Sequence, residues 1–321
     1  VENFRGFEHL TVEPLGRINL IAGKNNVGKT ALLEAIWLHH GYHNPSLGLS
    51  IDAFRGLDRI RKDEFLWDLF HDFNVHAPIV LSSLDADDRQ RTLAITYRER
   101  LTSRVQLGGG GGGNGQESSH PVDVELDWEL TNAAGAKIRA QATIQGDSAE
   151  FTRPAGVKEA DAIFLAARHP ETPQTLAERF SNVAVSKQLD EVVRVMQIVE
   201  PRLVDLSVQQ RGGVPTIFGD VQRPRLMPLA LMGEGMGRLL SIALAIPNAR
   251  DGIVLVDEIE NGLHHSIMEK VWRAIGELAE RHDIQLFATT HNVECIAAAH
   301  RAFSQNGHYE FRLHRLEVPP R

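Results

Sequence analysis

The feature that most constrains this chain is a glycine-containing stretch, Gly23-Lys24-Asn25-Asn26-Val27-Gly28-Lys29-Thr30. Two glycines with four residues between them, followed by Lys and Thr, match the phosphate-loop pattern. An apolar run over 18–21 precedes the stretch and helical spacing over 30–40 follows it, so the expected strand, loop and helix are in place. The glycines let backbone N–H groups turn toward phosphate oxygens, and the helix directs its positive end at them. The sequence therefore predicts a site for a nucleoside triphosphate.

The last two residues of the motif have the most specific expected roles. Lys29 would reach the β and γ phosphates, and the Thr30 hydroxyl would ligate Mg²⁺. A glycine turn before a capped helix is the alternative interpretation of the same residues. The predicted nucleotide-binding residues of this stretch are Gly23, Lys24, Asn25, Asn26, Val27, Gly28, Lys29, Thr30 and Ala31.

The second half of such a site should be a buried strand that ends in acidic residues, and 253–258 (IVLVDE) has this pattern. We expect Asp257 to hold the Mg²⁺ shell and Glu258 to orient and polarise the attacking water. His291 follows the next predicted strand and is a candidate sensor of the γ-phosphate. Acidic strand ends and loop histidines also occur in ordinary turns, which is the alternative interpretation. The phosphate loop in the same chain favours the assignment of these residues to a nucleotide site. The predicted catalytic residues are Glu258, His291 and Lys29, and the predicted metal ligands are Thr30 and Asp257.

The hydrophobic pattern divides the rest of the chain. Strands and helices alternate from 234 onward, as in a parallel sheet covered on both faces. Helical spacing over 51–73 and 174–200 frames a region, 79–151, whose alternating pattern indicates antiparallel strands. We predict one domain, 1–321, with four parts: a phosphate-loop lobe (1–50), a helical and antiparallel insertion (51–160), a helical lobe (161–250) and the segment with the acidic strand end and His291 (251–321).

Composition narrows the class of protein. The net charge of −8 argues against nonspecific polyanion binding by the chain as a whole. Cys295 is the single cysteine, which excludes an internal disulfide framework and fits a reducing compartment. No apolar run approaches the roughly 18 residues of a spanning helix, and no secretory signal is visible. A cytoplasmic protein without membrane attachment is therefore expected.

Four segments, in this order, resemble those of ABC-type ATPases related to the OLD, RecF and SMC proteins: NFRGF, GKNNVGKT, LVDEIENGLHH and FATTHN. The resemblance spans nearly the whole chain and is closest to bacterial OLD-allied AAA-family ATP-binding proteins without a Toprim domain. It implies an α/β fold, an ABC-type P-loop NTPase with a mostly parallel central sheet, an antiparallel β-rich insertion and a helical signature lobe. It also implies ATP and Mg²⁺ as ligands.

The same resemblance implies a signature segment at Gly233-Glu234-Gly235-Met236-Gly237-Arg238. In the family this segment of one subunit closes over ATP held by another. Gly233, Glu234 and Gly235 are therefore expected to contact a partner's nucleotide, in a homodimer or higher homo-oligomer. A charge reversal at Arg238 is expected to weaken the dimer without damaging the chain's own phosphate loop. Met232 stands near the position of the signature serine of transport-type proteins, and His264 stands where an aspartate is expected.

Two more positions have open interpretations. Arg5, in NFRGF, resembles a nucleotide-proximal position of SMC-like relatives, although an exposed strand arginine is the simpler interpretation. Arg168 and His169 follow a predicted strand, 162–167, and either replace the glutamine loop of ABC proteins or are turn residues.

Three other clusters have ordinary explanations. His39, His40 and His43 point in different directions on a helix end and do not predict a metal site. The glycine run 108–113 is expected to be a hairpin connection because no buried strand and helix frame it. Asp85-Ala86-Asp87 is similar to the acidic pair of Toprim nucleases, but a Toprim domain would follow the ATPase segments. The composition of 85–91 predicts a solvated turn instead. Any nuclease activity would therefore belong to a partner.

Three functions remain open from the sequence. The resemblance favours an ATP-hydrolysing switch that controls a separate effector such as a nuclease, in bacterial anti-phage defence. A RecF-like DNA-binding repair ATPase would need a basic surface. Two groups of residues are candidates for it: Arg55, Arg59, Arg61 and Lys62, or Arg98, Arg100 and Arg104. The nucleotide subunit of a membrane transporter is disfavoured by the irregular signature and the long insertion.

Overall fold

The computed structural model describes residues 1–55, 66–101, 122–145, 148–157, 162–169, 171–304 and 310–317. The chain folds into two compact units. The first unit comprises Val1–Thr11 and Glu34–Glu159, and the second comprises Val12–Leu33 and Ala160–Arg321. Helix α1 (Lys29–His40) begins in the second unit and ends in the first. The predicted lobe 1–50 is therefore shared by both units.

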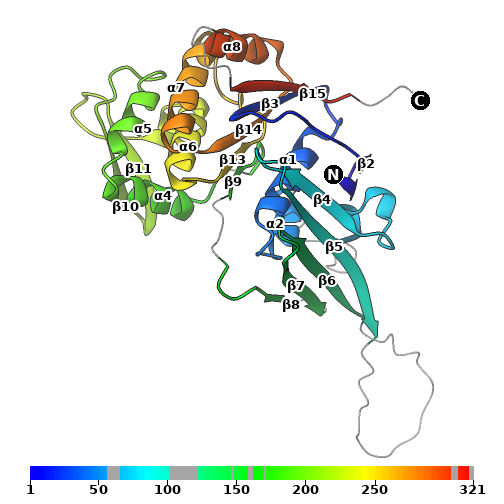
Figure 1. Ribbon diagram of the computed structural model, residues 1–321. Coiled ribbons are helices and arrows are strands. Elements are labelled where there is room, and N and C mark those ends of the chain that lie inside the picture. The colour runs from blue at the N-terminus through cyan, green and yellow to red at the C-terminus, as the bar shows by residue number, and fades with distance from the viewer. Residues whose placement is uncertain are drawn as a thin grey trace, which may run out of the picture. The chain divides into compact units, whose positions relative to one another are not determined.

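A five-stranded parallel sheet forms the centre of the second unit (Figure 1). Its order is β15 (Phe311–Arg315), β3 (Ile18–Ala22), β14 (Gln285–Thr290), β13 (Ile253–Val256) and β9 (Ala162–Leu165). Every neighbouring pair is parallel. β13 is buried along its whole length, as a continuous apolar run predicts for a central strand. Because all five strands run the same way, their carboxyl ends lie at one edge, where ligands bind in open α/β sheets.

Helices build the core against one face of this sheet. The second unit contains α4 (Pro173–Val185), α5 (Leu189–Met196), α6 (Glu234–Asn248), the short η4 (His265–Ile267), α7 (Met268–Arg281) and α8 (Val293–Ser304). α6 contacts β9 and β13, and α7 packs along α8. Leu239 of α6 and Trp272 of α7 are fully buried in the same apolar cluster as Val254. The helical periodicity of the sequence thus fixes which face of each helix meets the sheet.

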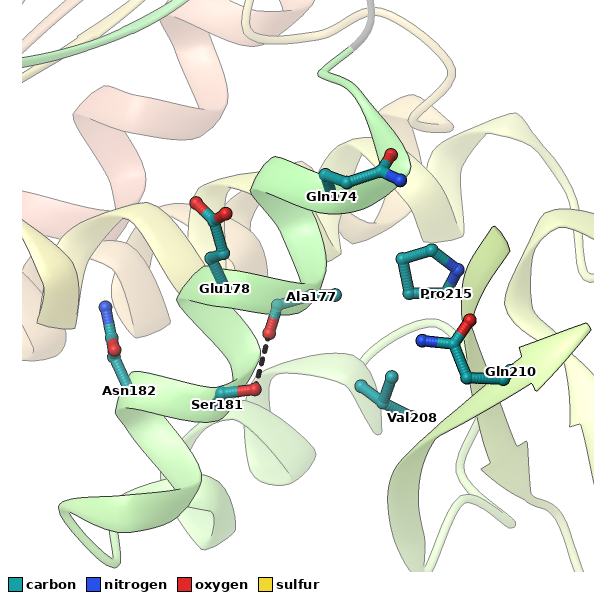
Figure 2. A pocket seen from close by; sticks show the side chains of 8 residues that line it. All are labelled: Gln174, Ala177, Glu178, Ser181, Asn182, Val208, Gln210 and Pro215. Carbon is teal, nitrogen blue, oxygen red and sulfur yellow. Dashed lines mark hydrogen bonds between the residues drawn. The ribbon is translucent and has the colours of Figure 1, made fainter. Parts of the chain in front are cut away.

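A small antiparallel sheet completes the second unit. Its order is β10 (Asp205–Arg211), β11 (Val214–Asp220) and β12 (Met227–Pro228), followed by η3 (Leu229–Leu231). α4 contacts β11, and α5 contacts β10. A shallow groove is lined by α4 on one side and by β10 and β11 on the other (Figure 2). Glu178 is the one charged residue among the described side chains that line it.

The first unit is built on a seven-stranded antiparallel sheet. Its order is β2 (Phe7–His9), β1 (Glu2–Phe4), β4 (Ile79–Leu84), β5 (Gln90–Leu101), β6 (Val122–Thr131), β7 (Lys137–Gln145) and β8 (Ser148–Thr152). Alternate residues of β5 to β7 are buried, Trp128 among them, and the intervening residues form surface ion pairs such as Arg139–Glu129. One face is therefore apolar and the other charged, as the alternating sequence predicts.

Most of the expected elements are present. The antiparallel character of 79–151 is confirmed, and the first two strands of the chain join the same sheet. In the region where helices were expected, 51–73, the structure has the α-helix α2 (Leu47–Phe54) and two short 3-10 helices, η1 (Leu66–Leu69) and η2 (His71–Phe73), while 56–65 lies outside the described residues. The glycine run 108–113 also lies outside the described residues, as do Arg59, Arg61, Lys62 and Arg104. No helix within the described ranges is long and apolar enough to cross a membrane.

Candidate nucleotide-binding site

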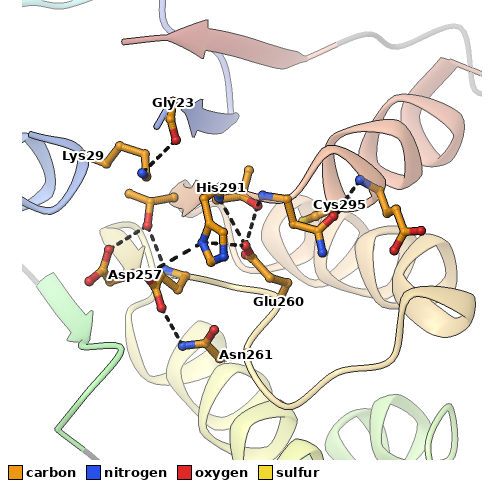
Figure 3. A network of polar contacts seen from close by, with 12 residues as sticks. Gly23, Lys29, Asp257, Glu260, Asn261, His291 and Cys295 are labelled. Carbon is orange, nitrogen blue, oxygen red and sulfur yellow. Dashed lines mark hydrogen bonds and ion pairs between the residues drawn. The ribbon is translucent and has the colours of Figure 1, made fainter. Parts of the chain in front are cut away.

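The phosphate-loop residues connect β3 to α1 at the carboxyl edge of the parallel sheet. Asn26 and Gly28 have left-handed backbone angles, with φ of 63° and 96°, and the first helical hydrogen bond runs from Leu32 N–H to Gly28 O at 2.9 Å. The Lys29 ammonium donates to the backbone oxygen of Gly23 at 2.9 Å (Figure 3). It also donates to the backbone oxygen of Lys24 at 2.8 Å. The loop therefore curls around the side chain of its own lysine.

Gly23 has a packing role that the motif does not explain. Leu316 donates its backbone N–H to Ala22 O at 2.8 Å, which brings the chain after β15 against the start of the loop. A Cβ on Gly23 would lie 2.7 Å from Leu316 O and 2.9 Å from Val27 Cγ2. A side chain at this position would thus displace the loop, whatever the loop binds.

Asp257, at the end of β13, lies beside the start of α1. The Thr30 hydroxyl donates to its two carboxylate oxygens at 3.0 and 3.1 Å. Thr289 Oγ1 donates to the same carboxylate at 2.6 Å and accepts the backbone N–H of Glu258 at 2.8 Å. The sheet register produces this contact, because Val256 pairs with Ala288 and the next residues on both strands are then neighbours. Thr289 is a site residue that sequence reasoning missed.

Glu258 and His291 are brought together at the same edge. Glu258 has a left-handed φ of 50°, and its Oε2 accepts a hydrogen bond from Asn261 Nδ2 at 2.9 Å. His291 Nδ1 lies 3.9 Å from Glu258 Oε1 and 3.4 Å from Glu260 Oε1. The side chains of Glu258 and His291 are 36% and 46% exposed, so both are open to a ligand. Asn261 and Glu260 were also missed, because alternation and motif spacing give no signal for them.

The signature segment forms the start of α6. Gly233 precedes the helix with φ of 106°, a backbone conformation that favours glycine, and Gly233 and Glu234 are exposed. A Cβ on Gly235 would lie 2.2 Å from Gly262 O, in the loop after β13. Gly235 is therefore required by packing within the chain, independently of any partner.

Arg238 lies close to the chain's own acidic strand end, which bears on one expectation. Its guanidinium is directed into the second unit, where Nη1 donates to Ala166 O at 3.2 Å and Nη2 donates to Asp257 O. Burial lowers the pKa of Arg238, and the carboxylates of Asp257 and Glu171 oppose this shift. A charge reversal at this position would place a carboxylate against the backbone oxygen of Asp257. The expectation that Arg238→Glu leaves the chain's own phosphate loop undamaged stays a prediction, and the contact with Asp257 O argues against it.

The remaining candidates lie in different surroundings. Arg5 belongs to the first unit, where its Nε lies 3.6 Å from Glu34 Oε2, so its nucleotide-proximal role stays a prediction. Arg168 and His169 are exposed in the turn after β9. His264 Nδ1 accepts the Ser266 N–H at 3.3 Å and so caps η4.

The comparisons with known proteins bear on this geometry. The family model described as "AAA domain, putative AbiEii toxin, Type IV TA system" matches residues 18–297 of this chain. The chain belongs to this AAA-domain family. An "ATP/GTP phosphatase" of Helicobacter pylori is 21% identical over 327 residues, which is 92% of this chain and 85% of that protein. The "DNA replication and repair protein RecF" of Pseudoalteromonas translucida is 56% identical, but over 39 residues, which is 12% of this chain and 11% of that protein.

Solved structures include similar head domains of SMC proteins. The SMC head domain from Thermotoga maritima has a TM-score of 0.40 and 15% identity, and the match covers 93% of this chain and 89% of that one. An SMC head bound to the C-winged helix domain of ScpA has a TM-score of 0.46 and 13% identity, with 93% and 90% covered.

This AAA-domain protein is a P-loop ATPase with an α/β fold. The strand before the phosphate loop, β3, and the strand before the acidic pair, β13, both flank β14 in one parallel sheet. Strands β4 to β8 of the antiparallel sheet lie within the predicted insertion, 51–160, whereas β1 and β2 of the same sheet lie outside it. The motifs are far apart in the chain, and the crossing connections of the parallel sheet bring them together.

The histidine cluster of this ATPase lies in the first unit. His39 Nε2 and Ser83 Oγ are 2.8 Å apart. Burial, and secondarily Arg91, lowers the pKa of His39 to about 3 and that of His40 to about 4. Within the described ranges, no group of three or more His, Cys, Asp or Glu side chains is placed to hold a metal ion. We assign these histidines a role in packing.

Proposed function

We propose that this AAA-domain ATPase is a switch that binds ATP and Mg²⁺ at the phosphate loop, dimerises around the nucleotide and controls a separate effector protein. One observation carries the nucleotide site. The Thr30 hydroxyl and the Asp257 carboxylate, 227 residues apart in the chain, meet at 3.0 Å, and the adjacent Lys29 ammonium is held by loop carbonyls. A phosphate-binding cation and two hard oxygen donors are thus assembled from the start of α1 and the end of β13.

The donor set fits both ligands. A threonine hydroxyl and a carboxylate are oxygen donors of the kind that Mg²⁺ prefers. The left-handed residues Asn26 and Gly28 shape the loop so that successive backbone N–H groups can converge on an anion. Bound Mg²⁺ would supply positive charge that stabilises charge developing on the phosphates.

The chain's own residues then have defined tasks. Lys29 exchanges its bonds to the loop carbonyls for bonds to the β and γ phosphates. Glu258 orients the attacking water and accepts its proton, with its carboxylate held by Asn261. His291 contacts the γ-phosphate from the exposed side of its ring. Thr289 fixes Asp257 and the backbone of Glu258 so that the two carboxylates keep different directions.

Dimerisation is supported by the start of α6. Gly233 and Glu234 are exposed, and the N-terminus of a helix favours a negatively charged ligand. We infer that Gly233, Glu234 and Gly235 meet the nucleotide of a second copy through backbone amides. Met232 replaces the signature serine, so this contact does not depend on a hydroxyl.

The effector role has its support in the family. Its description names a putative AbiEii toxin of a type IV toxin–antitoxin system, which fits a protein that acts with a second component in bacterial anti-phage defence. A nuclease is our preferred class of effector. The RecF-like alternative is not favoured, since the RecF match covers 12% of the chain. Of its candidate basic residues, Arg55, Arg98 and Arg100 form ion pairs with carboxylates.

The nucleotide site is tested with Lys29→Ala and a matched control, Lys270→Ala, which removes an exposed lysine of α7. Calorimetry with Mg²⁺ and ATP should show at least about 100-fold weaker binding for Lys29→Ala, because the phosphates lose their main cation in a preorganised site. The control should bind as the unmodified protein does. Unchanged affinity in Lys29→Ala would refute the site.

The effector is tested by purification from the native host with ATP present. Stable association with a second protein is expected, together with its loss in Lys29→Ala. Recovery of this polypeptide alone, with tight DNA binding, would instead support the repair ATPase.

A further inference from the structure

Glu260 makes three contacts through one oxygen, and two of them are with His291. Its Oε1 accepts the Thr290 hydroxyl at 2.7 Å and the backbone N–H of His291 at 3.2 Å, and it lies 3.4 Å from His291 Nδ1 (Figure 3). The carboxylate thus joins the loop after β13 to the residues that end β14. It fixes both the backbone and the ring of the histidine.

These contacts decide which ring nitrogen carries a proton. Nδ1 faces Oε1 of Glu260 at 3.4 Å and Oε1 of Glu258 at 3.9 Å, and both are acceptors. A lone pair on Nδ1 would be repelled by both oxygens, so a hydrogen on Nδ1 is favoured, either in the neutral ring or in the imidazolium. The partner of one ring nitrogen commonly sets the state and direction of the other. Nε2 is thereby the nitrogen directed to a ligand.

The burial of Glu260 indicates that its contacts with His291 are maintained at a cost in folding free energy. Its side chain is 8% exposed, and Oε2 is buried without a hydrogen-bond partner among the described residues. A buried carboxylate oxygen without a donor is unfavourable. An apolar residue of similar size would avoid this cost but would not hold the imidazole.

We propose that Glu260 is a positioning residue for ATP hydrolysis, which holds the His291 ring through a hydrogen on Nδ1 so that Nε2 faces the terminal phosphate and, in the imidazolium form that the two neighbouring carboxylates favour, donates its own hydrogen to it. Glu260 acts through His291 and does not touch the nucleotide. This inference rests on the proposed function, since it assigns a terminal phosphate to His291.

A double-mutant cycle tests the inference in the full chain. The variants are Glu260→Gln, His291→Ala and both together, with Glu280→Gln as a control that neutralises an exposed carboxylate of α7. Glu260→Gln should lower kcat on the order of 10-fold with little change in KM, because the amide keeps an acceptor beside Nδ1 but loses the negative charge that favours the imidazolium form of His291. In the His291→Ala background it should cost almost nothing more. Independent losses that multiply, or an unchanged kcat, would overturn the proposal.

Histidine ¹⁵N resonances supply a readout that needs no nucleotide. The His291 signal is the one of the 15 histidines that is missing in His291→Ala. It should show a protonated Nδ1 in the unmodified protein and a changed Nδ1 shift in Glu260→Gln. An identical shift in the two proteins would overturn the positioning role. Absence of ATP binding by the unmodified protein would instead refute the proposed function, and the two failures are therefore distinguishable.

A second variant keeps the inference testable if Glu260→Gln is too unstable to be assayed. Thr290→Val removes the 2.7 Å donor to Glu260 Oε1 and keeps the size of the side chain. It should shift the His291 resonance in the same direction and lower kcat by a smaller factor. No effect on either quantity would count against the proposal.

Discussion

Two acidic strand ends in this chain have similar sequences and different structures. Asp257 and Glu258 follow β13 of the parallel sheet, and Asp85 and Asp87 follow β4 of the antiparallel sheet. Asp257 is buried and accepts hydroxyl groups from Thr30 and Thr289. Asp85 is exposed and accepts the backbone N–H groups of Asp87 and Arg89 within its own turn.

The difference comes from the direction of the strands. In a parallel sheet the carboxyl ends of all strands lie at one edge, so residues from distant segments converge there. In an antiparallel hairpin a strand end is followed at once by the returning strand, and its acidic residues bond locally. A pair of acidic residues is therefore informative about function only when the topology around it is known.

The largest expected effect is at the buried acidic end. Glu258→Gln should lower kcat by at least about 100-fold, because the amide cannot accept the proton of the attacking water. Lys29, Thr30 and Asp257 stay in place, so ATP should still bind and light scattering should show a persistent dimer. Hydrolysis at the unmodified rate would contradict the assignment. A variant that stops hydrolysis yet stays monomeric with ATP would contradict the dimer.

Substitution of Arg238 tests whether the acidic end of β13 depends on the hydrogen bonds that this side chain donates. Arg238→Gln removes donors to the backbone oxygens of Ala166 and Asp257, so the free energy of unfolding should fall by about 1–3 kcal/mol. ATPase activity should fall as well, since the residue before Glu258 loses its support. Arg202→Gln, on an exposed arginine, is the control for chemical denaturation. Unchanged stability and activity would place Arg238 outside the site.

Substitution of two glycines of α6 by alanine is expected to have smaller effects, on the stability of the fold, and the two variants form a matched pair. Gly235→Ala should destabilise the fold by about 1–3 kcal/mol, because the new methyl group overlaps Gly262 O at 2.2 Å. Gly237 has no described atom within 4 Å of a Cβ, so Gly237→Ala should be neutral or stabilise by up to about 1 kcal/mol. Thermal melts of the two variants decide this. Equal effects would refute the contact between the helix start and the loop after β13.

The smallest effect is expected at the exposed acidic turn. Asp85→Asn should leave ATP binding and hydrolysis unchanged. Hydrogen bonds from the Arg89 and Asp87 backbones lower the pKa of Asp85. Its contribution to stability is therefore present above the pKa of the unfolded chain and is lost as the pH falls through the lower folded value. A carboxyl titration by NMR measures this pKa, and a loss of ATPase activity would break the comparison.

The strands and helices of the second unit follow closely from the sequence. The apolar run 253–256 is β13 as predicted, and the alternation of strands and helices expected from 234 onward includes α8. Helical periodicity was less informative for the first unit. Within the helical region expected over 51–73, the segments Leu66–Leu69 and His71–Phe73 form 3-10 helices. Short 3-10 helices depend on tertiary packing. The hydrophobic periodicity of one segment carries no information about that packing.

The sequence by itself determined the phosphate loop, the acidic strand end and the strand–helix alternation, because local spacing and hydrophobic period encode them. The tertiary structure alone decided that Thr289 bridges Asp257 and Glu258, that Glu260 holds His291 and that Arg238 is directed toward its own acidic strand. Each of these contacts joins side chains from different strands or helices. Their partners are fixed by sheet register and helix packing, which arise only when distant segments meet.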